Sequence, residues 1–167
     1  MLFRSCVSGD TIRTVLQAFS LVVTAWLVIH GWEVAHQKAA LRDRRKEVRE
    51  FVEDLKEAAF ALESLGRKYW LMEPGDESDA LAAEIRLKMS RLSLAVTRLK
   101  NAEDIDAITA IKNLRIAITG DDFDVLGRTI ALIGSAKLMA IGQAAIKFES
   151  DLEGGFMEQF PSQPRLK

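Results

Sequence analysis

The amino-acid sequence predicts an all-α protein, in which an N-terminal transmembrane helix continues into a cytoplasmic antiparallel helical bundle. Three observations lead to this prediction. One long apolar run carries no charge, apolar residues recur at helical spacing through the rest of the chain, and no segment has the alternating pattern of a strand. The chain has 167 residues, of which 49% are hydrophobic, and this length suffices for one bundle with a buried core.

Composition excludes several classes of protein. With 23 basic and 24 acidic side chains, the chain lacks the basic excess of a dedicated nucleic-acid-binding protein. Its single cysteine, Cys6, excludes an intramolecular disulfide and a cysteine-based zinc site. It contains no phosphate-binding loop, dinucleotide fingerprint, nucleophile elbow or zinc-protease motif. We therefore expect no enzymatic activity, no metal and no cofactor.

The first element after a short N-terminal tail of residues 1–13 is a predicted transmembrane helix over residues 14–32. This run, TVLQAFSLVVTAWLVIHGW, has no formal charge, and as a helix it would measure about 28 Å, close to the hydrocarbon thickness of a bilayer. Trp26 and Trp32 lie toward its end, where indole rings favour the membrane interface. A cleaved signal peptide would have a shorter apolar region and a small-x-small site, and a buried core helix is the remaining alternative.

Basic residues flank the predicted span unequally. Arg4 and Arg13 precede it, whereas six basic residues lie within residues 33–50. The span is predicted to lie in a bacterial inner membrane. The positive-inside rule then places the N-terminus outside the cytoplasm and the C-terminal domain inside it. Five of the six are also predicted to contact anionic lipid headgroups. These residues are Arg42, Arg44, Arg45, Lys46 and Arg49.

One face of the predicted span is polar. At 100° per residue, Gln17, Ser20, Thr24 and Gly31 lie close to one line along the helix. Lipid disfavours such a stripe, so it is predicted to face protein or water. The stripe is interpreted as a helix–helix contact in a homo-oligomer, and a water-filled pore lined by these residues is the alternative.

Two histidines lie at the end of the predicted span, in the pattern His30-x-x-Glu33-x-x-His36. One helical face could present all three side chains to a metal or haem. Helical metal pairs use a spacing of four residues, however, and no further ligand is evident. These residues are therefore interpreted as polar groups at the membrane interface.

Residues 36–72 are predicted to form a juxtamembrane coiled-coil helix, because apolar residues recur every seven positions. The first set is Leu41, Val48, Leu55, Leu62 and Tyr69. The second set, three positions later, is Arg44, Phe51, Ala58, Leu65 and Met72. The sequence EPGD at residues 73–76 ends the helix, because proline and glycine together mark a turn.

Three further helices complete the predicted cytoplasmic bundle of residues 33–153. The second helix follows an N-cap at Ser78, and the third ends at Gly120. The last helix runs from about residue 123 to 152 and ends at Gly154–Gly155, leaving residues 154–167 as a flexible tail. It is the most apolar part of this region, but Lys137 in its middle opposes membrane insertion, at a cost of about 3 kcal/mol. Conditional insertion of this helix stays an alternative.

Four features together resemble a group of uncharacterised small single-span bacterial inner-membrane proteins with a cytoplasmic helical domain. They are the span ending in tryptophans, the basic run RDRRKEVR, the pair Tyr69–Trp70, and LRIAITGDDFD at residues 114–124. The resemblance implies an anchor and a helical domain, with no activity attached to particular residues. The layout is also similar to small accessory proteins of mobile elements and phage-defence loci, some of which assemble as membrane pores.

These observations predict a single-pass membrane protein without enzymatic activity. We expect it to homo-oligomerise through its span and juxtamembrane helix, and to use the bundle as an assembly module or to bind a cytoplasmic protein partner. An oligomeric membrane pore or membrane-perturbing effector is the alternative function.

Overall fold

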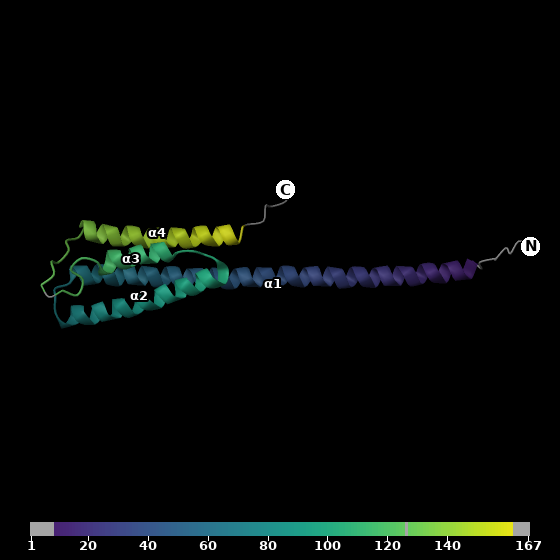
Figure 1. Ribbon diagram of the computed structural model, residues 1–167, viewed down its shortest axis with the longest axis horizontal. Helices are drawn as coiled ribbons and strands as arrows, with labels where there is room; N and C mark the ends of the chain where they lie inside the picture. The colour runs from purple at the N-terminus through teal and green to yellow at the C-terminus, as the bar shows by residue number, and fades with distance from the viewer. Residues whose placement is uncertain (1–8, 126, 162–167) are drawn as a thin grey trace, which may run out of the picture. The chain divides into compact units, whose positions relative to one another are not determined.

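A computed structural model describes the backbone of residues 9–125 and 127–161, and the side chains from residue 19 onward within these ranges. The regular secondary structure of this part of the chain is helix, with no strand, which confirms the all-α part of the predicted fold class. The four helices are α1 (Gly9–Leu71), α2 (Asp76–Glu103), α3 (Ile108–Thr119) and α4 (Ala136–Gln159) (Figure 1).

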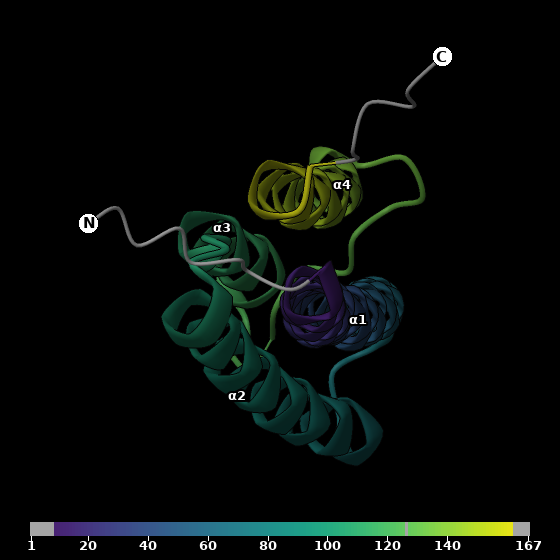
Figure 2. The same cartoon turned by 90° about the vertical axis from the view of Figure 1, so that its right-hand side faces the viewer.

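The chain divides into two compact units, residues 1–46 and residues 47–167. Helix α1 contributes residues to both. In the second unit, which we call the helical unit, residues 47–71 of α1 lie beside α3, and α2 and α4 lie on opposite sides of this pair (Figure 2). One continuous core joins all four helices, and among its fully buried members are Leu62, Ile85, Ile118 and Phe148.

The heptad face of α1 is buried inside the helical unit rather than free to form a coiled coil with another chain. Its buried positions alternate in steps of four and three residues, and they are Val48, Val52, Leu55, Ala59, Leu62, Gly66 and Tyr69. The predicted second set was therefore wrong by one position: Phe51 and Leu65 are only half-buried and Ala58 is exposed. Leu41, in the first set, is also exposed. The seven-residue repeat is present, but from Val48 onward its apolar side chains pack into the core of the same chain.

The N-cap of helix α2 lies three residues before the predicted one. Gly75 occupies the N-cap position, and Ser78 acts from the first turn of the helix. The Ser78 hydroxyl accepts a hydrogen bond from the Gly75 N–H at 3.0 Å and donates one to the Gly75 carbonyl at 2.8 Å. Ser78 thus ties the helix start to the turn, but as the third helical residue and not as the N-cap.

The predicted last helix was wrong at both ends. The described residues between Gly120 and Ser135 form turns and extended chain, with Gly127 and Gly134 at φ values of +80° and +83° that favour glycine. The Ala131 N–H donates to the Trp70 carbonyl at 2.8 Å, which holds this loop on the end of α1. At the other end, α4 continues past Gly154–Gly155 to Gln159, so the tail does not begin at residue 154.

Candidate functional site

The N-terminal part of α1 exposes apolar side chains on all sides. Phe19, Leu27, Val28 and Ile29, which lie about a quarter of a turn apart around the helix, are each between 58% and 68% exposed. In the part of the chain that the structure describes, this is the one helix long and apolar enough to cross a membrane, and none of its most apolar window is buried. The segment is therefore not the core helix of a soluble domain. Length and composition make α1 a candidate membrane span.

The predicted polar stripe is retained in part. Ser20, Thr24 and Gly31 are exposed, and a Cβ atom added to Gly31 would meet nothing within 4 Å. The Thr24 hydroxyl donates to the Ser20 carbonyl at 2.8 Å, so its proton is satisfied within the helix. The side chain of Gln17 lies outside the described residues. Among the described positions the stripe thus presents small side chains or none, and at Thr24 the hydroxyl proton is bonded within the helix.

The two histidines contact tryptophans one helical turn away, one ring pair tilted and the other edge-to-face. The ring centroids of Trp26 and His30 are 4.7 Å apart, and those of Trp32 and His36 are 4.3 Å apart. His30 Nδ1 lies 3.9 Å from a carboxylate oxygen of Glu33. No group of three potential ligands for a metal ion occurs among the residues from 9 to 161 that are described. The histidines and tryptophans form two aromatic pairs at the end of the candidate span.

The predicted basic residues of the headgroup region do not all have the same surroundings. Arg42 and Lys46 are exposed. Arg44 is exposed and Arg45 half-buried, and both interact within the chain. Arg49 belongs to the helical unit: it pairs with Glu53 at 2.6 Å and with Glu153 of α4 at 2.7 Å. Its guanidinium also lies 5.2 Å from the centroid of the Phe156 ring. The lipid-contact prediction therefore has less support at Arg49 than at Arg42 or Lys46.

An ion-pair cluster that sequence reasoning missed joins α1 to α4. Lys56 pairs with Glu153 at 2.7 Å and with Glu149 at 3.3 Å, and Glu153 also accepts the bond from Arg49. The hydrogen bonds from Lys56 and Arg49 lower the pKa of Glu153. The bond to Glu153 likewise raises the pKa of Lys56. Basic residues spaced by seven on α1 and glutamates spaced by four on α4 were the available sequence signal, but only the register of the two helices brings them together.

A second missed feature is an aromatic–cation cluster beneath the loop after α3. Arg128 is only 4% exposed, and its guanidinium lies 4.2 Å from the Tyr69 ring centroid while donating to the Met72 carbonyl at 2.8 Å. Lys137 Nζ lies 4.4 Å from the Trp70 ring centroid, and the Trp70 indole N–H donates to the Ile118 carbonyl at 2.9 Å. These contacts fix the loop on the end of α1. Beyond them, Leu132 and Ile133 are 78% and 90% exposed.

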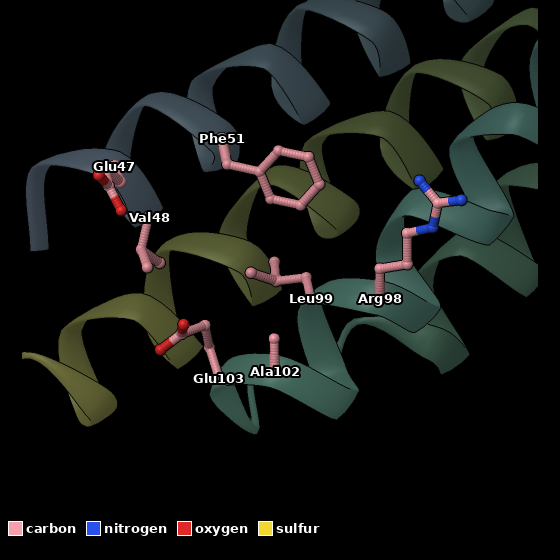
Figure 3. A pocket seen from close by; sticks show the side chains of 7 residues that line it. All are labelled: Glu47, Val48, Phe51, Arg98, Leu99, Ala102 and Glu103. Carbon is pink, nitrogen blue, oxygen red and sulfur yellow. The ribbon is translucent and has the colours of Figure 1, made fainter. Parts of the chain in front are cut away.

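A groove of about 250 Å³ lies between α1 and α2 (Figure 3). Phe51 of α1 and Leu99 and Ala102 of α2 point toward one another in its centre. Carboxylates of Glu47 and Glu103 lie at one end, and the guanidinium of Arg98 lies at the other. The groove can accept an apolar side chain flanked by groups of either charge, and it holds no arrangement of nucleophile and base for catalysis.

No family model, curated protein or solved structure matches the chain. The resemblance to small single-span membrane proteins therefore stays a prediction, and function must be argued from the chain itself.

Proposed function

We propose that the protein is a single-pass inner-membrane protein without enzymatic activity, which homo-oligomerises through its span and carries a cytoplasmic antiparallel bundle as an assembly or partner-binding module. One observation supports this most strongly: α1 exposes Phe19, Leu27, Val28 and Ile29 around its circumference, whereas the helical unit has a buried apolar core. Exposure on this scale is unfavourable in water and favourable in lipid.

The burial of the heptad repeat reduces the surface of α1 that is available for oligomerisation. From Val48 to Tyr69 the repeat is covered by α2, α3 and α4, so this part of α1 offers no coiled-coil seam to a second copy. The proposed contact is therefore the face of the span that carries Ser20, Thr24 and Gly31, because small residues let two helices approach closely in lipid.

Cysteine cross-linking in membranes tests the proposed contact. In a Cys6→Ser background, single cysteines at Ser20, Thr24 and Gly31 should give disulfide-linked dimers under mild oxidation. The matched controls are Val22→Cys and Ile29→Cys, which lie on the opposite side of the helix and should give monomers.

Three results of this experiment decide between the alternatives. Dimers confined to the Ser20 face support a helix–helix contact. Equal cross-linking on both faces, or none at any position, contradicts it. For the pore alternative, the same face would have to line a lumen, and expression of the protein would then have to depolarise cells in a manner abolished by Thr24→Leu.

A further inference from the structure

A second pocket, of about 270 Å³, opens between α2 and α3 on the helical unit. Helix α2 contributes residues from consecutive turns of one face, α3 contributes two residues one turn apart, and the chain after α3 contributes an aromatic ring. The lining residues are Arg86, Met89, Ser90, Ser93, Arg115, Thr119 and Phe123. The pocket thus combines two guanidinium groups, three hydroxyl groups and two apolar side chains.

The two arginines of this pocket differ in their partners. Arg86 forms an ion pair with Asp124, which is 38% exposed. Arg115 is exposed, and no carboxylate lies within ion-pair distance of it in the part of the chain that the structure describes. Helix α3 itself contains no acidic residue. One guanidinium is therefore free for an anion, and the other is held by a carboxylate that an anion could replace.

Hydroxyl groups and apolar side chains fill the remaining wall. The Ser93 hydroxyl donates to the Met89 carbonyl at 2.8 Å, and the Thr119 hydroxyl donates to the Arg115 carbonyl at 2.9 Å. Both hydroxyl protons are bonded to backbone carbonyls, so these two oxygens can only accept hydrogen bonds from a ligand. Met89 is 3% exposed and forms an apolar floor with the half-buried Phe123. A ligand that fits has an anionic group for the arginines and an apolar part for the floor.

We propose that this pocket binds a phosphomonoester with a small apolar substituent. A phosphomonoester presents three oxygens and a charge of about −1.5 to −2 to the two guanidinium groups, whereas a carboxylate presents two oxygens and a single charge. Paired arginines recognise phosphate through charge-assisted hydrogen bonds. Binding moves the Asp124 carboxylate off Arg86. The Asp124 backbone stays in place, because its N–H donates to the Tyr69 hydroxyl at 2.8 Å. Rotation of one side chain therefore admits the ligand.

Calorimetry of the full chain in phosphatidylcholine nanodiscs, with phenyl phosphate as the probe, tests this proposal. Arg115→Gln should weaken binding roughly tenfold or more, because it removes the charged hydrogen bonds of one guanidinium. Asp124→Asn should tighten binding about two- to fivefold, because it removes the competing carboxylate from an exposed ion pair. The control Arg91→Gln changes an exposed arginine of α2 outside the pocket and should have no effect.

The outcomes separate the proposal from nonspecific charge effects. Equal losses for Arg115→Gln and Arg91→Gln, or no binding by the unchanged chain, would overturn it. Weaker binding by Asp124→Asn would also contradict it, even if Arg115→Gln lost structure. Competition by phosphatidic acid in the nanodiscs would identify a lipid headgroup as the source of the phosphomonoester, and no competition would identify a soluble ligand.

Discussion

Two adjacent glycines of α4 should respond oppositely to the same substitution. Gly154 is exposed, and a Cβ atom there would meet nothing within 4 Å. A Cβ atom on Gly155 would lie 2.8 Å from Cγ2 of Ile105, a side chain with no exposed surface. Ile105 is β-branched and stiff at its first torsion, so its methyl group cannot swing aside easily. Alanine is therefore tolerated at the first position and overpacks the core at the second.

The expected magnitudes follow from helix propensity and packing. Replacing glycine by alanine inside a helix gains about 1 kcal/mol at either position. Gly154→Ala should therefore raise the free energy of unfolding by about 1 kcal/mol. At Gly155, overpacking costs roughly 1–3 kcal/mol and offsets or exceeds that gain. The free energies of unfolding of the two variants should differ by about 1–3 kcal/mol. This difference depends only on the overpacking, because the gain in helix propensity is the same in both variants and cancels.

Thermal unfolding of the full chain in detergent micelles, followed by circular dichroism, measures this difference. For a helical unit of this size, 1 kcal/mol corresponds to about 4 °C in Tm. Gly154→Ala should melt above the unchanged chain, and Gly155→Ala below Gly154→Ala by about 4–12 °C. If α4 instead ended at these glycines, alanine at Gly154 would destabilise the protein, and that result would refute the reasoning.

Two further perturbations test the contacts around α1. The bonds from Lys56 and Arg49 lower the pKa of Glu153, so at acid pH the unfolded chain binds more protons than the folded chain. The free energy of unfolding should therefore fall as the pH drops below about 4.3, the ordinary pKa of a glutamate, and through the lower pKa of the folded state. Glu153→Gln should lose stability at neutral pH and show a flatter acid limb in urea titrations; an unchanged acid limb would contradict the pairing. Trp70→Phe should cost about 1–3 kcal/mol, because it leaves the Ile118 carbonyl without its 2.9 Å bond, whereas unfolding that matches the unchanged chain would count against that bond.

Helical periodicity predicted the elements of the chain well where short-range patterns decide them. The apolar run and the EPGD turn bound the long first helix, and α1 does end at Leu71, just before Pro74. The heptad repeat located the buried face of α1 but misplaced its second position, because a repeat of seven fits a partner position at either three or four residues. Val52, Ala59 and Gly66 settle that register through contact with the other helices.

The loop after α3 could not be predicted from composition, because the interactions that hold it are long-range. Its apolar residues were interpreted as a helical face, whereas Arg128 is buried on Tyr69 and Ala131 is bonded to Trp70. The sequence signals were Gly127 and Gly134, both of which adopt positive φ. Both lie inside residues 123–152, for which one continuous helix was predicted.

The prediction from glycine was also wrong at the end of α4, where the residues expected to end the helix lie inside it. The pair Gly154–Gly155 was interpreted as a helix stop, yet the helix passes through it to Gln159. Gly155 is required for the close approach of Ile105, which no local pattern reveals. The ion-pair cluster and the pocket between α2 and α3 were missed for the same reason, since both depend on which turns of separate helices face each other.

Labelling of Cys6 tests the central claim, a single span with the helical unit in the cytoplasm, most directly. Cys6 is the only cysteine and precedes the candidate span. On intact spheroplasts, a membrane-impermeant maleimide should label Cys6 but not an exposed cysteine introduced by Ser64→Cys in a Cys6→Ser chain, which should react only after permeabilisation. Labelling at Ser64→Cys with protection of Cys6, or recovery of the protein in the soluble fraction, would contradict the account.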